Sequence, residues 1–229
     1  MAEGERALIV GAGSGLSASL ARRAAREGMA LVLAARDTQK LEALARETGA
    51  QAVACDASRP EEVDRLFATL DAGGERLDLV VYNPSARARG PIVELDPEAV
   101  RHAITVTAFG GFLVARAAAQ RMTKQGHGTI LFTGASASVK GYARSSSFAM
   151  GKFALRGLAQ SLARELQPQN IHVGHIVIDG GIASPQRTAN GPDALLDPDA
   201  IADAYFSLYR QHRSAWAWEI ELRPWVETF

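Results

Sequence analysis

The sequence has only one cysteine, Cys55, among its 229 residues. A single thiol excludes an intrachain disulfide and a zinc site built from several thiolates. The five histidines are scattered along the chain and are interpreted as ordinary core or surface residues. We therefore expect neither cross-links nor a bound metal to hold the fold together.

The sequence also lacks an excess of charge of either sign. Lys plus Arg and Asp plus Glu both total 25, so the formal net charge is +0. A neutral chain has no general attraction for nucleic acid or for an anionic membrane, and we expect neither as a partner. A small anionic ligand would need only a local cation.

Long apolar runs are missing as well, and no stretch is expected to approach membrane-spanning length. The chain starts with a charged segment over residues 1–6, and the apolar run after it is short and interrupted by glycine. This pattern does not fit a signal peptide, so we expect a cytoplasmic protein.

Short apolar runs alternate with longer segments of helical period. Strands are predicted over residues 7–10, 30–34, 51–55, 77–82, 129–132, 172–178 and 216–222, and helices over 16–27, 38–48, 59–72, 97–124, 146–166 and 198–211. Continuously apolar strands are typical of a parallel sheet that is buried on both faces. The alternation predicts an α/β fold, a Rossmann-type doubly wound, seven-stranded parallel sheet in a single domain over residues 1–229. Residues 179–198 have loop composition and are predicted to form a substrate loop.

Local signals mark several helix boundaries. Asp96 and Asp197 each precede a proline and are predicted N-caps, because proline costs no hydrogen bond in the first turn of a helix. Ser58, with Glu61 three residues later, predicts a capping box. The glycine pair that begins at Gly110 interrupts the longest helix and predicts a bend or a close packing contact.

A glycine-rich turn follows the first predicted strand and opens the first predicted helix. Glycines permit a tight turn and a close backbone approach, and a helix N-terminus offers free N–H groups and a positive dipole to phosphate. The position of the turn favours a dinucleotide site over an ordinary strand–helix connection. The predicted cofactor-binding residues of this turn are Gly11, Gly13, Ser14, Gly15 and Leu16.

The end of the second strand indicates which dinucleotide binds. Dinucleotide folds that bind NAD place an acid there for the ribose hydroxyls, whereas a nearby arginine accommodates the 2′-phosphate of NADP. Here Ala35 ends the strand and Arg36 follows it, while Asp37 is interpreted as the cap of the next helix. A guanidinium pairs well with phosphate, so the sequence favours NADP(H) over NAD(H).

At this point the chain resembles the short-chain dehydrogenase/reductase family along nearly its whole length. Residues 11–17 resemble the family's Gly-xxx-Gly-x-Gly turn, with Ser17 in place of the last glycine. Residues 55–57, 82–86 and 178–185 resemble its adenine-contacting, Asn-Asn-Ala-Gly and nicotinamide-covering segments. The resemblance implies that the cofactor also contacts Asp56, Ala57, Asn83, Gly181 and Ile182.

The segment 148–152 resembles the family's Tyr-xxx-Lys motif, with Lys152 in place and Phe148 where the tyrosine belongs. Counting back without gaps places the family's serine at Ala135 and its helix asparagine at Thr107. In this family the tyrosine gives the proton, the lysine lowers the tyrosine's pKa and binds the nicotinamide ribose, and the serine holds the substrate oxygen. Lys152 lies four residues after Phe148, hence on the same helix face, and is predicted to keep its contact with ribose.

Other hydroxyls near these positions are candidate substitutes. Ser136 is the predicted catalytic partner of Lys152 if the strand end is shifted, whereas Ser138, Tyr142 and the serines at 145–147 are more simply interpreted as loop and helix-start residues. Water is a further alternative, provided that the substrate is already activated. Arg87 and Arg89 follow the fourth strand. They are interpreted either as part of a solvated loop or as residues that attract an acidic substrate.

Two main hypotheses follow. The first is an NADP(H)-dependent oxidoreductase with a non-standard route of proton delivery, acting on a small-molecule substrate. The second is a non-catalytic NADP(H)-binding sensor or assembly subunit, which the missing phenol favours; a redox-neutral enzyme that uses the same pocket is a third. The resemblance also implies a homodimer or homotetramer, built through the fourth and fifth helices and the last strand.

Overall fold

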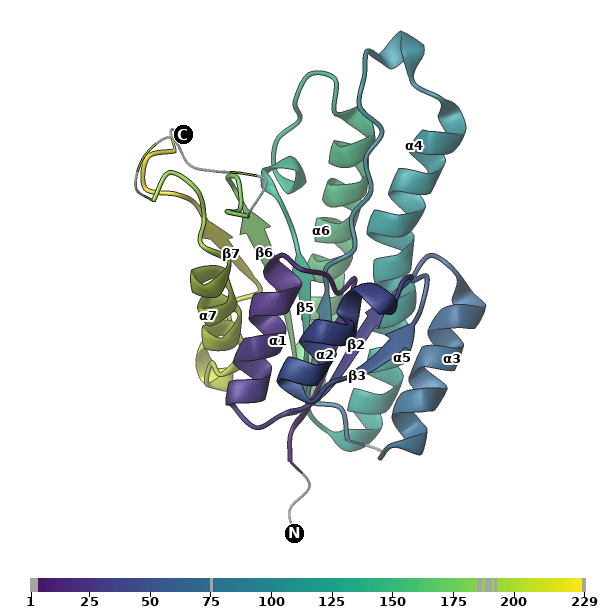
Figure 1. Ribbon diagram of the computed structural model, residues 1–229, viewed down its shortest axis with the longest axis vertical. Coiled ribbons are helices and arrows are strands. Elements are labelled where there is room, and N and C mark those ends of the chain that lie inside the picture. The colour runs from purple at the N-terminus through teal and green to yellow at the C-terminus, as the bar shows by residue number, and fades with distance from the viewer. Residues whose placement is uncertain (1–3, 75, 185–186, 188–190, 192, 228–229) are drawn as a thin grey trace.

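The computed structural model describes residues 4–74, 76–184, 187, 191 and 193–227. Seven parallel strands form one sheet in the order β3-β2-β1-β4-β5-β6-β7 (Figure 1). The strands are β1 (Arg6–Val10), β2 (Ala30–Ala35), β3 (Gln51–Ala54), β4 (Leu79–Tyr82), β5 (Gly128–Thr133), β6 (Ile171–Ile178) and β7 (Glu219–Leu222). The predicted α/β class, the doubly wound sheet and its seven strands are therefore confirmed.

Helices cover both faces of the sheet, as the continuously apolar strands require. One apolar cluster joins the sheet to α1 (Leu16–Arg26), α2 (Glu42–Thr48) and α7 (Pro198–Tyr209). A second cluster joins the other face to α3 (Pro60–Ala72), α5 (Gly110–Gln125) and α6 (Ser146–Leu166). All eight residues of β6 are buried, because this strand lies between both layers.

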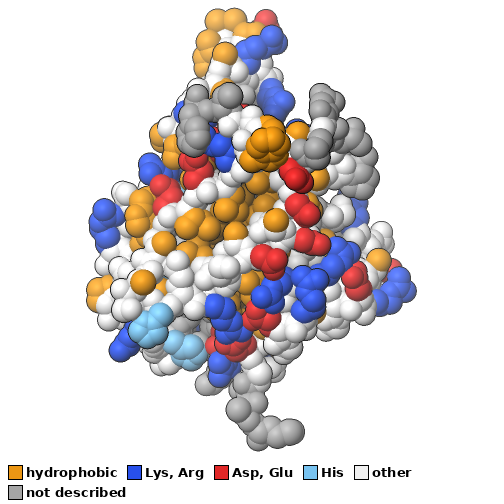
Figure 2. Space-filling model, turned by 90° about the vertical axis from the view of Figure 1, so that its left-hand side faces the viewer, with side chains coloured by type: hydrophobic (Ala, Val, Ile, Leu, Met, Phe, Trp, Pro, Cys, Tyr) orange, Lys and Arg blue, Asp and Glu red, His pale blue; other side chains and the backbone are white. Residues whose placement is uncertain are grey.

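Helices α1 and α7 pack side by side on one outer face of the domain. An ion pair joins Arg23 of α1 to Asp203 of α7 at 3.0 Å, and Arg210 at the end of α7 pairs with Glu27 and Glu5. Figure 2 shows the side of the molecule that carries α7 and β7, with apolar side chains near its centre and acidic and basic side chains gathered beside them.

Several helix boundaries were predicted correctly, and others were not. Asp96 accepts hydrogen bonds from the backbone N–H groups that follow it at the start of α4 (Pro97–Ile104), and Asp197 does the same at the start of α7. Ser58 does not cap α3, because the helix begins one residue later than a Ser58 cap requires and Ser58 donates instead to Asp56. The last strand begins at Glu219 rather than at residue 216, because its pairing with β6 starts at Glu219, opposite His175.

Helix α4, a π-helical segment (Thr105–Phe109) and α5 form one continuous helix over 97–125. Its length and mean hydropathy of 1.3 are sufficient for a membrane span, so the expectation that no stretch approaches that length was wrong. In this fold 44% of the most apolar stretch of the helix is buried inside the domain.

The glycine pair allows this long helix to approach the sheet, which confirms close packing as the role of the pair. A Cβ added at Gly110 would lie 2.4 Å from Tyr82 Oη and 2.7 Å from the backbone oxygen of Ala57. A Cβ added at Gly111 would lie 2.6 Å from Leu155 of α6. The helix therefore contacts β4 and α6 at a distance that only glycine permits.

We expect Gly110→Ala to lower the free energy of unfolding by about 1–3 kcal/mol, because the added methyl group meets backbone that cannot give way. Gly157→Ala is the matched control, since Gly157 lies in the interior of α6 with open space around it. Alanine there should raise stability by about 0.5–1 kcal/mol. Urea unfolding of both variants measures the difference, and equal effects would contradict the packing argument.

Candidate functional site

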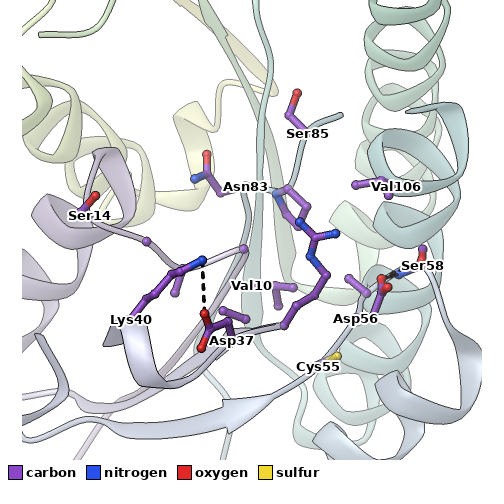
Figure 3. Close-up of a pocket in the computed structure, with 17 residues that line it drawn as sticks. Val10, Ser14, Asp37, Lys40, Cys55, Asp56, Ser58, Asn83, Ser85 and Val106 are labelled. Carbon is purple, nitrogen blue, oxygen red and sulfur yellow. Dashed lines mark hydrogen bonds and ion pairs between the residues drawn. The ribbon is translucent and has the colours of Figure 1, made fainter. Parts of the chain in front are cut away.

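The first of two adjoining pockets lies at the carboxyl ends of β1, β2 and β4, where the strand order reverses between β1 and β4. Open α/β sheets bind their ligands at such a switch point. The pocket has a volume of about 670 Å³ (Figure 3). Its lining includes Gly11, Gly13, Ser14, Arg36, Lys40, Asp56, Ala57 and Asn83.

The glycine-rich turn presents bare backbone to this pocket. Gly11 has φ +77°, and a Cβ there would lie 2.7 Å from the backbone nitrogen of Pro84, so only glycine fits. A Cβ at Gly13 would meet nothing within 4 Å and would occupy the space of the pocket itself. Gly15 precedes α1 without a side-chain cap, and Leu16 is buried beneath the turn; neither lines the pocket.

Ser17, which departs from the family's glycine, ties the turn to the neighbouring strand. Its hydroxyl donates to the Gly11 backbone oxygen at 3.1 Å and accepts from Asn83 Nδ2 at 2.7 Å. Ser17 is buried, and Asn83 follows β4 directly. This relay fixes the turn relative to the switch point, a role that the sequence did not reveal for Ser17.

Charged side chains line the pocket on both sides. Arg36 lines it and is exposed. Lys40, which the sequence pattern did not indicate, also lines it and forms an ion pair with Asp37 at 3.2 Å, on the side of Ser14, whereas Asp56 and Ser58 lie across from them (Figure 3). Asp56 accepts hydrogen bonds from the Ser58 backbone N–H at 3.0 Å and from its hydroxyl at 2.7 Å. Desolvation raises the pKa of Asp56, but these hydrogen bonds and the charge of Arg36 outweigh it and lower that pKa overall.

The second pocket adjoins the first, since Asn83 and Ser85 line both. It has a volume of about 540 Å³ and lies at the carboxyl ends of β5 and β6. Its lining includes Ala135, Ser136, Tyr142, Ser145, Phe148, Lys152, Gly181 and Ile182. The structure thus brings the predicted catalytic pair, Lys152 and Ser136, to one cavity. The predicted loop over 179–198 borders it through residues 179–182 and 187; residues 185–186, 188–190 and 192 lie outside the described part of the chain.

Lys152 is the most deeply buried cation of the site, with 2% of its surface exposed. Its ammonium donates to the backbone oxygen of Thr133 at 2.7 Å. Burial, with a smaller contribution from the charge of Arg87, lowers the pKa of Lys152 to about 7. Lys152 is therefore able to exchange a proton near neutral pH.

Phe148 lies on the same face of α6 as Lys152, as predicted from the four-residue spacing. Its ring supports the guanidinium of Arg87, whose Cζ lies 3.8 Å from the ring centroid. The Lys152 Nζ lies 5.9 Å from the same centroid. Arg87 is exposed and lines the second pocket, so the two interpretations of this segment, a solvated loop and a site for an acidic substrate, both stay open.

The chain segment that carries Arg87 is anchored on both sides. The hydroxyl of Ser147 accepts from the Ala88 backbone N–H at 2.9 Å and donates to the Ala88 backbone oxygen at 2.8 Å. The hydroxyl of Thr107 accepts from the Ala86 N–H at 3.2 Å. Both hydroxyls are fully buried, so they hold the segment and do not face a substrate.

The comparison with known proteins agrees with this geometry. The profile of the family described as short chain dehydrogenase matches residues 5–193. The chain belongs to the short-chain dehydrogenase family. The resemblance drawn from the sequence motifs is therefore confirmed.

Relatives of this short-chain dehydrogenase cover almost its whole length. The short-chain reductase protein NovJ of Streptomyces niveus is 29% identical over 209 residues, which span 86% of this chain and 79% of that protein. The structure of a short-chain dehydrogenase from Rhodopseudomonas palustris has a TM-score of 0.84 at 35% identity, covering 96% of this chain and 99% of that one. A metagenomic short-chain oxidoreductase in complex with NADP has a TM-score of 0.85 at 28% identity, covering 97% and 98%. The family comprises oxidoreductases that bind nicotinamide cofactors.

The remaining candidate hydroxyls of this short-chain dehydrogenase divide into two groups. Ser136, Tyr142 and Ser145 line the second pocket, with Ser136 at the start of a 3₁₀ turn (Ser136–Ser138). Ser138 is fully buried and accepts from the Ala135 N–H at 3.1 Å, so it shapes the turn. The interpretation as a structural loop residue therefore fits Ser138. Tyr142, in contrast, places a phenol on the wall of the pocket.

We expect Ser17→Ala to weaken dinucleotide binding about 3- to 10-fold, the size of one lost hydrogen bond. NADPH and NADH should be affected equally, because the turn is expected to face the diphosphate that both share. Titration of the nicotinamide fluorescence measures both affinities. A loss confined to NADPH would contradict a role for Ser17 in positioning the turn.

Proposed function

We propose that this protein is an NADP(H)-dependent oxidoreductase that acts on a small molecule and delivers the proton without a tyrosine. The observation that carries the proposal is the position of Lys152, a buried amine with a pKa of about 7 on the wall of the second pocket. The first pocket would hold the dinucleotide, and the second would hold the substrate. Asn83 and Ser85 join the two.

The residues of the first pocket fit NADP(H). The bare backbone at Gly11 and Gly13 leaves room for the diphosphate, and Asp56, Ala57 and Asn83 also line the pocket, in agreement with the family resemblance. Arg36 and Lys40 supply positive charge where the 2′-phosphate would lie. The solved relative that is 28% identical and contains NADP supports the same choice. When bound, the cofactor supplies a hydride at the nicotinamide ring; Lys152, Gly181 and Ile182 line the pocket on that side.

We expect Arg36→Ala to weaken NADPH binding about 10- to 100-fold, the range for losing hydrogen bonds to a charged group. NADH binding should stay within about twofold of wild type, because NADH carries no 2′-phosphate. Arg46→Ala is the matched control, since Arg46 is exposed on α2 and does not line the pocket. Equal weakening of both cofactors would rule out the assignment of Arg36 to the 2′-phosphate.

Lys152 is the proposed proton source for the reduced substrate, and Ser136 is proposed to hold the substrate oxygen. A general acid is most effective when its pKa lies near the working pH, and Lys152 meets this condition through burial. Phe148 has no proton to give and instead supports Arg87, whose charge helps to lower the pKa of Lys152. Tyr142 is the second candidate donor, because its phenol faces the same cavity.

This mechanism predicts the pH dependence of reduction. The ammonium form of Lys152 is required, so kcat should fall as the pH rises through about 7. Arg87→Gln should move that midpoint upward, because one neighbouring positive charge is removed. Lys152→Met should lower kcat by about 10²- to 10⁴-fold, the usual contribution of a positioned acid. If kcat does not change around neutral pH while Tyr142→Phe abolishes it, Tyr142 is the donor and this role of Lys152 is wrong.

A second candidate function is a non-catalytic NADP(H)-binding sensor or assembly subunit. Phe148 and Ala135 favour it, because neither side chain has a hydroxyl and both line the second pocket. Binding of NADPH without its oxidation by any carbonyl, imine or enone would support this function. We further propose a cytoplasmic homodimer or homotetramer, since the family is typically oligomeric and α5 exposes stacked apolar rings at Phe112 and, just before it, Phe109.

A further inference from the structure

Among the described residues that line the second pocket, basic side chains outnumber acidic ones. Arg87, Arg89 and Arg187 line it together with Lys152. No ion pair involves any of the three arginines within residues 4–74, 76–184, 187, 191 and 193–227. Burial, followed by the charges of Arg89 and Arg187, lowers the pKa of Arg87, so the three guanidinium groups repel one another.

The acidic residues of the pocket do not offset this charge. Asp179 pairs with cations other than these arginines: its carboxylate lies 3.3 Å from Lys140 and 2.8 Å from Arg223. Glu227 also lines the pocket and is exposed. Apart from Asp179 and Glu227, no aspartate or glutamate among the described residues contributes to the lining.

Two of the three arginines, Arg87 and Arg187, contact the pocket wall before any ligand arrives. Arg87 is stacked on Phe148, and the residues on either side of it are hydrogen-bonded to Thr107 and Ser147. Arg187 passes across Gly181, where an added Cβ would lie 2.9 Å from Nη1. Charged groups kept together against their mutual repulsion are typical of a binding site for the opposite charge.

The dinucleotide does not account for this cluster. Its phosphates are assigned to the glycine-rich turn and to Arg36, which line the other pocket, and none of the three arginines lines that pocket. We propose that the second pocket binds a substrate bearing a carboxylate or phosphate group, held by Arg87, Arg89 and Arg187. The guanidinium fork matches the oxygen spacing of both groups. This inference rests on the proposed function for the identity of the pocket as the substrate site.

In this arrangement the ring of Phe148 serves only to support Arg87, whereas a tyrosine at this position would also serve catalysis. Its apolar ring supports Arg87 over one face, so the guanidinium edge is left for the ligand. Phe148→Leu removes the π-face and keeps an apolar side chain, so it should weaken anion binding several-fold and leave NADP⁺ affinity unchanged.

The test is calorimetry on protein saturated with NADP⁺, with benzoate, phenyl phosphate and the neutral analogue benzamide as probes. At least one anion should bind about 10-fold or more tightly than benzamide, the range for hydrogen bonds to a charged group. Comparing benzoate with phenyl phosphate identifies the preferred group. Substituting Arg87, Arg89 and Arg187 together by Gln should abolish the preference. The control substitutes the exposed Arg46, Arg116 and Arg213 by Gln, which removes the same total charge from sites outside both pockets.

Equal binding of benzamide and both anions would overturn the proposal, and so would a preference that survives the triple substitution. If the triple variant loses NADP⁺ affinity as well, the arginines serve the cofactor and the proposal is wrong. Because the readout is binding, a protein that never oxidises NADPH can still confirm the anion site. Failure of the proposed function and failure of this inference are therefore distinguishable.

Discussion

Parallel pairing from β1 through β6 sets the geometry of this protein, because it brings the carboxyl ends of the strands to one edge of the sheet. Residues from distant parts of the sequence meet there: Gly11 in the glycine-rich turn, Arg36 after β2 and Asn83 after β4. The close approach of the long helix at Gly110 keeps the next layer tight against the same region. Both pockets follow from this arrangement, one on each side of Asn83 and Ser85.

Two positions where the chain departs from the family's motif residues, 148 and 107, have structural uses here. Phe148 supports a guanidinium, and Thr107 fastens the segment that carries it. Lys152 lines the second pocket, but position 148 carries no phenol, and burial lowers the pKa of Lys152 to about 7. The replacement of tyrosine by phenylalanine at position 148, beside the buried amine of Lys152, connects the proposed proton route with the proposed substrate class. The same ring positions Arg87, whose charge acts on Lys152.

The sequence predicted those features that depend on local pattern. Apolar runs predicted the strand boundaries to within two residues, except at the start of β7. Aspartate followed by proline predicted two helix starts. Of the residues predicted to bind the cofactor in the glycine-rich turn and after β2, Gly11, Gly13, Ser14 and Arg36 line one pocket, whereas Gly15 and Leu16 do not. Contacts between distant segments were not predictable from pattern. The Ser147 hydroxyl meets Ala88 across 59 positions, and Arg87 reaches Phe148 across a loop whose path no periodicity encodes.

The central claim is that this fold, with phenylalanine at position 148, still transfers hydride. Its most direct test is to follow NADPH absorbance while the wild-type protein is mixed with aldehydes, ketones, imines and enones that carry a carboxylate or a phosphate. The account predicts oxidation of NADPH with at least one of them, and loss of that oxidation in Lys152→Met at saturating cofactor. Tight NADPH binding without oxidation across the whole panel would contradict it and leave a cofactor-binding protein without dehydrogenase chemistry.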